Sequence, residues 1–231
     1  MSTLYVVGTP IGNLEDVTFR AIRILKEVDC ILCEDTRVTK RLLERYEIKD
    51  KKLTTYNERK SGINTNKVIK LLEEGKNLAL VSDAGTPGVS DPGSFLISQI
   101  REYFANKSAE GTEVKIIPIP GPSALTAAVS IVGASVHDFT FLGFLPHKKG
   151  RETLFKEIAS TNRTIVLYES PHRIMKTLES LKKHIPERKI AIARELTKIH
   201  EQFISGTAGE LLEYFNKNKE KIRGEFVVIV G

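Results

Sequence analysis

The sequence has 231 residues, of which 41% are hydrophobic and 28% are charged, and its formal net charge is +6. This apolar content excludes a disordered chain, and no apolar run approaches the ~20 residues that cross a bilayer, so we expect no membrane partner. Because two cysteines cannot form a disulfide framework, and the first residues resemble a strand rather than a signal peptide, we predict a cytoplasmic location.

Short apolar runs alternate with helical patterns along the first half of the sequence. Val17, Ala21, Ile24 and Val28 recur at helical spacing, whereas residues 78–82 form a continuous run typical of a buried strand. These patterns predict strands over residues 4–8, 30–34, 53–56, 78–82 and 114–118, and helices over residues 17–28, 36–46, 63–74 and 94–104.

The alternation resumes after a Pro-rich segment at residues 118–122. Here the patterns predict strands over residues 139–144, 164–168, 190–193, 200–205 and 226–230, and helices over residues 123–132, 172–184 and 208–216, with one more after the basic loop 146–151. Such alternation indicates an α/β fold, which we expect to form two αβα domains with mostly parallel sheets. The expected boundaries are 1–118 for the N-terminal domain, 119–122 for a Pro-rich hinge and 123–231 for the C-terminal domain.

Three loops concentrate glycine and proline at the ends of predicted strands. Residues 8–13, 82–93 and 118–123 contain six of the nine prolines, and each loop begins where a strand ends. Ligands of open α/β sheets bind at this edge; glycine allows close approach to the backbone, and proline keeps a loop rigid. We therefore expect a shared ligand cleft. The loops match neither a Walker A motif nor Gly-x-Gly-x-x-Gly, which disfavours a P-loop enzyme or a standard Rossmann dehydrogenase.

Charged segments follow three other predicted strands, at residues 34–37, 168–173 and 194–198. Each segment can either cap a neighbouring helix or line the cleft, and the patterns leave both interpretations open.

Cys30 and Cys33 are three residues apart on a strand, so their thiols point to opposite faces and cannot share a metal. The five histidines show no zinc-binding spacing either, and we predict no metal site.

Eight short motifs occur in an order that is typical of one protein family. They are Gly-Thr-Pro-Ile-Gly-Asn-Leu from residue 8, Glu-Asp-Thr-Arg from residue 34, Ser-Asp-Ala-Gly-Thr-Pro-Gly from residue 82, Pro-Gly-Pro-Ser-Ala from residue 120, Gly-Phe-Leu-Pro from residue 143, Tyr-Glu-Ser-Pro-His-Arg from residue 168, Ala-Arg-Glu-Leu-Thr-Lys from residue 193 and Gly-Glu-Phe-Val from residue 224. By these motifs the sequence resembles, from Leu4 to Gly231, the RNA-modifying branch of the tetrapyrrole methylase (class III methyltransferase) superfamily.

The resemblance implies a specific reaction, the transfer of methyl from S-adenosylmethionine to the ribose 2′-hydroxyl of a cytidine in small-subunit (16S) ribosomal RNA. It also implies a homodimer and a cofactor held in the cleft between the two domains. By motif position, the implied cofactor contacts are Pro10, Ile11, Asp83, Gly85, Thr86, Val89, Ser123, Ala124, Tyr168, Leu196, Gly224, Glu225 and Phe226.

The implied reaction needs a group that assists deprotonation of the ribose hydroxyl, because a free hydroxyl is a poor nucleophile at neutral pH. The sulfonium of the cofactor already activates its methyl group, so no metal is required. Neither the patterns nor the resemblance selects one residue for this task. The candidates for base or orienting group are Glu34, Asp35, Glu169, His172, Glu195 and Lys198.

The net charge permits a polyanionic partner such as RNA without requiring one. Members of the resembled family commonly continue for several tens of residues after the Gly-Glu-Phe/Met-Val strand, whereas this sequence ends at Gly231. We therefore expect RNA docking to depend on basic residues near the cleft, which meet phosphates and carry little base specificity. These residues are Arg37, Lys40, Arg41, His147, Lys148, Lys149 and Arg151.

Two alternative functions stay open. A tetrapyrrole methyltransferase of the uroporphyrinogen or precorrin type shares the fold, but its members carry a Gly-Asp-Pro loop where this sequence has Ser-Asp-Ala-Gly-Thr-Pro. A ribosome-assembly factor that retains the fold without catalysis is the second alternative. Measurable binding of S-adenosylmethionine would count against it, because a pure scaffold has no need for three ordered loops.

Overall fold

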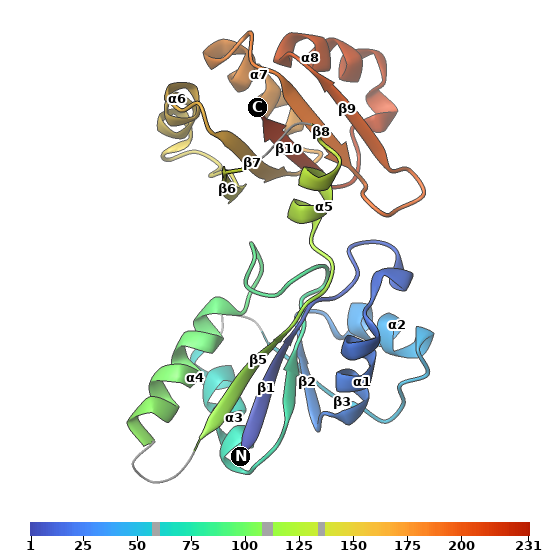
Figure 1. The fold of residues 1–231 in the computed structure, drawn as a ribbon, viewed down its shortest axis with the longest axis vertical. Helices are drawn as coiled ribbons and strands as arrows, with labels where there is room; N and C mark the ends of the chain where they lie inside the picture. Colours follow the sequence, from blue (N-terminus) through green and yellow to red (C-terminus); the bar gives the residue numbers. More distant parts are fainter. Residues whose placement is uncertain (57–60, 108–112, 134–136) are drawn as a thin grey trace. The chain divides into compact units, whose positions relative to one another are not determined.

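A computed structural model describes residues 1–56, 61–107, 113–133 and 137–231, and of residues 61–64 it describes the backbone alone. The chain forms two compact units, Met1–Ser123 and Ala124–Gly231, which are described separately below (Figure 1). Every predicted strand and helix is present, with its ends shifted by a few residues. Among the described residues, no helix is long and apolar enough to cross a membrane.

The first unit contains a five-stranded sheet in which every pair of neighbouring strands is parallel. Its order is β3-β2-β4-β1-β5, so that β3 and β5 are the edges. Parallel strands place their carboxyl ends at one edge of the sheet, where the Gly/Pro-rich loops begin. The strands are β1 (Ser2–Val7), β2 (Cys30–Cys33), β3 (Lys52–Thr55), β4 (Leu78–Leu80) and β5 (Val114–Ile119).

Helices cover both faces of this sheet, as the crossover connections of a parallel sheet require (Figure 1). A core on one face contains α1 (Phe19–Glu27) and α2 (Thr36–Arg45), and a 3-10 helix, η1 (Leu14–Asp16), precedes α1. The core on the other face contains α3 (Ser61–Glu73) and α4 (Ser94–Lys107). Cys33 belongs to the first core and Cys30 to the second, which confirms that the two thiols face apart.

The sheet of the second unit is mixed, in the order β6-β7-β10-β8-β9. Only β6 (Phe139–Phe144) and β7 (Thr164–Glu169) pair in parallel, whereas β10 (Phe226–Val230) is antiparallel to both β7 and β8 (Ile190–Arg194). The neighbours β8 and β9 (Gln202–Gly206) are also antiparallel. The expectation of mostly parallel strands is therefore right for the first sheet and wrong for the second. No helix separates β8 from β9, and a short connection allows only an antiparallel pair.

Three helices build the core on one face of the second sheet: α6 (Arg151–Ser160), α7 (Ile174–His184) and α8 (Ala208–Lys217). The short helix α5 (Ala124–Ser130) contacts β10, and a 3-10 helix, η4 (Lys219–Lys221), follows α8. Thr207 and Glu210 form a reciprocal capping box that fixes the start of α8. The loops of this unit therefore connect strands and helices that are packed together in one core.

Candidate active site

The first two Gly/Pro-rich loops of the first unit are paired through their backbones. The N–H of Thr9 donates to the carbonyl of Gly85 at 2.8 Å, and the N–H of Gly85 donates to the carbonyl of Thr9 at 3.0 Å. The hydroxyl of Thr9 adds a bond to the carbonyl of Ser82 at 3.1 Å. Gly85 has φ +82, a left-handed conformation that glycine adopts without strain. The two strand ends therefore form one fixed structure.

The third loop joins the other two by a close backbone contact. A Cβ on Gly8 would lie 2.9 Å from Cα of Gly121, and a Cβ on Gly121 would lie 2.8 Å from the carbonyl oxygen of Gly8. Thr86 of the second loop donates its hydroxyl to the carbonyl of Pro122 at 3.2 Å. Only glycine fits at positions 8 and 121, because backbone on the facing loop cannot move aside as a side chain can. The structure thus brings the three loops together within this unit.

The expected cofactor residues of the first unit lie on these joined loops. Pro10 is buried and Ile11 half-buried, and a Cβ on Gly85 would lie 3.4 Å from Ile11 Cγ2. Val89 closes a turn by donating its N–H to the carbonyl of Thr86 at 3.2 Å. Ser123 is half-buried at the end of the third loop. These residues share one edge of the sheet.

Asp83 connects the second loop to the charged segment after β2. Its Oδ1 accepts the backbone N–H of Asp35 at 3.0 Å, and its side chain is exposed. The carboxylate of Asp35 in turn accepts the N–H of Arg37 at 2.8 Å and the Arg37 guanidinium through both oxygens. Hydrogen bonds from the side chain and backbone of Arg37 lower the pKa of Asp35 to about 2. A carboxyl with such a low pKa is a weak proton acceptor, and the Asp35 side chain caps the start of α2.

Glu34 stands beside this pair with a different environment. It is half-buried directly after β2, and its Oε1 is shielded from solvent. Lys40 and Arg41, consecutive residues about one turn beyond Arg37 on α2, are exposed. Of the expected RNA contacts in this unit, Arg37 forms an ion pair with Asp35, although the Arg37 side chain remains 86% exposed.

In the second unit, Tyr168 ties the end of β7 to the start of α5. The N–H of Leu125 donates to the Tyr168 hydroxyl at 3.0 Å, and the Tyr168 ring packs edge-on against Phe141 and Phe144. Ala124, the neighbour of Leu125, is half-buried there. Two expected cofactor positions, Ala124 and Tyr168, are therefore close together.

Glu195 bonds to two other expected residues of the second unit, Lys198 and Glu225. Its N–H donates to the carbonyl of Glu225 at 3.0 Å, and its Oε1 accepts Lys198 Nζ at 2.9 Å and the N–H of Glu225 at 3.3 Å. Partial burial opposes ionisation of Glu195, but the bonds from Lys198 outweigh it and lower its pKa. Lys198 is likewise partly buried, yet its bonds to Glu195 and Glu225 raise its pKa. The two candidates neutralise each other, so neither offers a free base.

The neighbours of this cluster limit how a ligand can be contacted. Leu196 is buried, and Gly224 is held at φ +79 beside Glu195. Phe226 is 1% exposed and packs against Phe215 with ring centroids 5.9 Å apart, so its side chain belongs to the core. Phe226 also pairs with both β7 and β8, so the structure places the expected cofactor contact at Phe226 inside the sheet.

Glu169 lies at the centre of a buried polar network. It is fully buried and accepts the Thr177 hydroxyl at 2.6 Å and the N–H of Ser170 at 2.8 Å, with Arg173 Nε at 3.3 Å. Arg151, which the sequence places among the RNA contacts, instead donates to Thr177 Oγ1 at 2.7 Å. Burial and the nearby charge of Arg173 lower the pKa of Arg151. These contacts were not visible in the sequence, where no pattern marks Thr177.

The other expected residues of the second unit are exposed. His172 lies on the turn before α7, and His147, Lys148 and Lys149 lie on the loop between β6 and α6. His147 Nε2 faces Arg173 Nη1 at 3.4 Å. Among the described residues, no group of three or more His, Cys, Asp and Glu side chains is placed to hold a metal ion.

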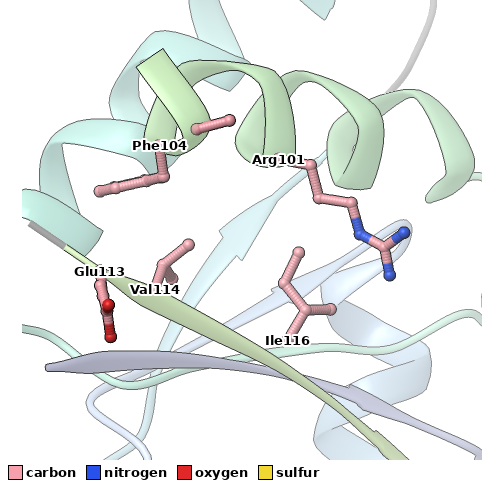
Figure 2. A pocket seen from close by; sticks show the side chains of 6 residues that line it. Arg101, Phe104, Glu113, Val114 and Ile116 are labelled. Carbon is pink, nitrogen blue, oxygen red and sulfur yellow. The ribbon is translucent and has the colours of Figure 1, made fainter. Parts of the chain in front are cut away.

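Two pockets lie away from the loops. Figure 2 shows the larger, of about 350 Å³, which Arg101 and Phe104 of α4 line together with Glu113, Val114 and Ile116. It lies beside the start of β5, whereas the third loop follows the end of that strand. A second pocket, of about 320 Å³, lies between α3 and α4. The expected cofactor residues line neither pocket.

Known proteins resemble the chain in sequence and fold. The sequence profile of the tetrapyrrole (corrin/porphyrin) methylases matches residues 3–212. The chain is 46% identical over its full length to "Ribosomal RNA small subunit methyltransferase I" of Thermotoga maritima and covers 99% of that protein. It is 42% identical over its full length to the protein of the same name in Bacillus subtilis and covers 75% of it.

Solved structures with lower identity share the fold. The methyltransferase CobJ matches with a TM-score of 0.70 and 23% identity, and the match covers 100% of this chain and 93% of that one. Diphthine synthase matches with a TM-score of 0.69 and 16% identity, over 100% of this chain and 90% of that one. These two matches support the fold and do not decide the substrate.

Proposed function

Since the chain belongs to the tetrapyrrole (corrin/porphyrin) methylase family, we propose that it methylates the ribose 2′-hydroxyl of a cytidine in small-subunit ribosomal RNA. The observation that carries this proposal is the 46% identity over the whole chain to a protein named for small-subunit rRNA methylation. The Ser-Asp-Ala-Gly-Thr-Pro loop supports the RNA substrate over a tetrapyrrole.

The methyl donor is S-adenosylmethionine, and the joined loops of the first unit suit it. The close contact between Gly8 and Gly121 and the left-handed Gly85 join the three loops into one fixed structure at the strand ends, where rigid backbone groups suit a ligand. When bound, the cofactor supplies a methyl group activated by its sulfonium. Asp83 offers carboxylate oxygens to hydroxyl groups, and Pro10 and Ile11 offer apolar contact.

The second unit would complete the cofactor contacts. Tyr168 and the adjacent Ala124 offer an aromatic ring and a small side chain, while Ser123 lies at the end of the first unit. The remaining proposed contacts, in part through backbone, are Leu196, Gly224, Glu225 and Phe226.

The proton of the 2′-hydroxyl requires an acceptor, and we propose that it is Glu34 or His172. Asp35 is paired with Arg37, Glu169 is fully buried in its network, and Glu195 and Lys198 neutralise each other. His172 is exposed, and imidazole is the side chain most often used as a general base. Glu34 is half-buried and precedes Asp35 in the charged segment after β2.

The proposed RNA contacts are exposed basic residues on each unit: Arg37, Lys40 and Arg41 on α2, and His147, Lys148 and Lys149 on the loop before α6. Phosphate contacts of this kind position RNA without reading its sequence. We also propose that the chain acts as a homodimer on the small ribosomal subunit in the cytoplasm. The family resemblance supports the dimer, and the location of ribosomal subunits supports the compartment.

The test is methyl transfer to small ribosomal subunits prepared without the modification. With labelled S-adenosylmethionine we expect label in the RNA, and primer extension at low nucleotide concentration should stop beside one cytidine. Subunits that already carry the modification should accept no label. If the chain binds the cofactor but labels no ribose, the RNA proposal fails; label in a uroporphyrinogen-type substrate would favour the tetrapyrrole alternative. Absence of cofactor binding would favour a scaffold without catalysis.

A further inference from the structure

The buried network around Glu169 has no task in the proposed reaction, yet two of its side-chain contacts, to Arg173 and Thr177, lead to the basic loop between β6 and α6. Both carboxylate oxygens of Glu169 are used, Oε1 by Ser170 and Arg173 and Oε2 by Thr177. A fully buried carboxylate is costly unless it is paired and hydrogen-bonded, so the folded protein depends on these contacts of Glu169.

Two arginines carry the network to the loop. Arg173 donates Nη2 to the carbonyl of Leu145, and Arg151 donates Nη1 to the carbonyl of Pro146 at 3.2 Å. The same Arg151 donates Nη2 to Thr177, and its guanidinium lies 5.1 Å from the ring centre of Phe155. The donors of both guanidinium groups are therefore directed at protein atoms rather than at solvent.

Leu145 anchors the start of the loop in the core, but the rest of the loop, residues 146–150, is exposed. Gly150 is the N-cap of α6 at φ +82 and provides no side-chain cap, and a Cβ there would meet nothing within 4 Å. The backbone N–H of Arg151 donates to the carbonyl of Lys148 at 3.2 Å, which fixes the peptide of that lysine relative to the arginine. Holding Arg151 thus holds Lys148 and its neighbour Lys149, whose side chains are exposed.

We propose that Glu169, Thr177, Arg173 and Arg151 form an internal brace that sets the position of Lys148 and Lys149 for contact with RNA phosphates. This inference rests on the proposed function and deepens it. Arg151 is then a positioning residue and not an RNA contact. Binding to a loop that is already ordered avoids the entropy cost of ordering it in the complex, so the brace raises RNA affinity without touching RNA.

The sharpest variant is Thr177→Val. Thr177 is fully buried, so no RNA reaches it, and valine keeps the shape while removing the hydroxyl that links Arg151 to Glu169. No charge changes. We expect the affinity for unmethylated small subunits to fall about threefold to tenfold, while calorimetry shows unchanged affinity for S-adenosylmethionine. The matched control is Ser180→Ala, which removes a hydroxyl of the same helix that donates to the carbonyl of Lys176.

A double-mutant cycle separates positioning from a general loss of stability. Replacing Lys148 and Lys149 together by alanine should weaken RNA binding strongly in the wild-type background. In the Thr177→Val background the same replacement should reduce the RNA affinity by a factor at least threefold smaller than in the wild type, because the lysines are already displaced. Independent sites give additive effects, so additivity overturns the inference. Arg151→Met, which loses the charge but has a long side chain that can still pack against Phe155, should show the same non-additivity and serves if Thr177→Val does not fold.

Hydrogen exchange provides a readout that does not involve RNA. In Thr177→Val we expect faster amide exchange across residues 145–150, and in Ser180→Ala we expect no change there. If amide exchange in Thr177→Val is unchanged while the wild-type protein binds RNA normally, this inference is overturned and the proposed function is not affected. If exchange responds as expected but the wild-type protein binds no ribosomal RNA, the proposed function fails and the RNA role of the loop fails with it.

Discussion

The carboxylate of Glu195 fills the space in which a side chain at Gly224 would begin. A Cβ on Gly224 would lie 2.1 Å from Glu195 Oε1, and the same oxygen accepts Lys198 Nζ. Two motifs that are about thirty residues apart in sequence therefore form one structure, where β8 ends and β10 begins. The φ of +79 favours glycine at 224, and a larger residue there would also displace the Glu195 carboxylate from its bonds to Lys198 and Glu225.

We expect Gly224→Ala to destabilise the second unit by about 2–5 kcal/mol, since left-handed strain costs ~1–2 kcal/mol and an overpacked contact about 1–3 kcal/mol. Denaturant unfolding followed by circular dichroism measures this. Gly133→Ala is the control, because Gly133 has φ +72 and a Cβ there meets nothing within 4 Å. Adding Glu195→Ala should reduce the Gly224→Ala penalty to that of the control. Equal penalties in both backgrounds would contradict the steric explanation.

The pairing of Asp35 with Arg37 predicts a dependence of stability on acid pH. The folded pKa of Asp35 is about 2, below the ~3.9 of an unfolded aspartate, so its contribution is complete above about pH 4 and is lost as the pH falls through about 2. Asp35→Asn keeps an oxygen that can cap α2 but removes the charge. The melting temperatures of wild type and variant should differ above about pH 5 and converge near pH 2.

This effect should be small and should weaken with salt, because the Arg37 side chain is 86% exposed. Asp16→Asn is the control, since it removes one charge from the same unit at an exposed carboxylate that forms no ion pair within the described residues. A wild-type-to-variant difference that persists unchanged down to pH 2 would show that the charge of Asp35 contributes nothing.

The sequence predicted the elements and the joined loops well, because both follow from local rules. Gly and Pro placed at strand ends predict loops at the carboxyl edge of a parallel sheet, and Thr9 and Gly85 do meet there. The direction of the strands in the second sheet was not predictable in the same way. Strand β10 comes last in the chain but inserts between β7 and β8, which is decided by packing of the whole unit.

The charge state and direction of individual side chains were the least predictable features of the site. Glu195 and Lys198 look like free candidates in their motif, but Glu225 and Gly224 complete their pairing from a distant part of the chain. Arg151 belongs to a basic run and yet donates to Thr177, 26 residues away. A sequence pattern does not show these partners, since they depend on tertiary contacts.

Asp83 and Thr86 give a prediction for cofactor affinity. Asp83→Asn keeps an acceptor for the N–H of Asp35 but removes the charge, and we expect about tenfold weaker binding of S-adenosylmethionine, since bonds to charged groups contribute about 1.5–3 kcal/mol. Thr86→Val loses the bond to Pro122 between two loops and should weaken binding about threefold. Calorimetry measures both, with Ser94→Ala, at the first residue of α4, as the control. Unchanged affinity in Asp83→Asn would remove Asp83 from the cofactor site.

The final prediction concerns the base. A general base contributes roughly 10²–10⁴ to the rate, and its protonation makes the rate fall toward low pH. Replacing the true base, by His172→Ala or by Glu34→Gln, should lower kcat by about 10²-fold or more and remove this acid limb, while KM for the small subunit changes little. Glu195→Gln should keep the limb, because Glu195 is already paired with Lys198.

His200→Ala is the matched control for His172→Ala, because His200 is an exposed histidine of the same unit. Added imidazole should restore activity to His172→Ala if His172 is the base, and should do nothing for Glu34→Gln. If both variants keep kcat and the acid limb, the acceptor is one of the paired groups, and its ion pair must open during the reaction. Loss of the limb in Glu195→Gln would identify that pair as the one that opens.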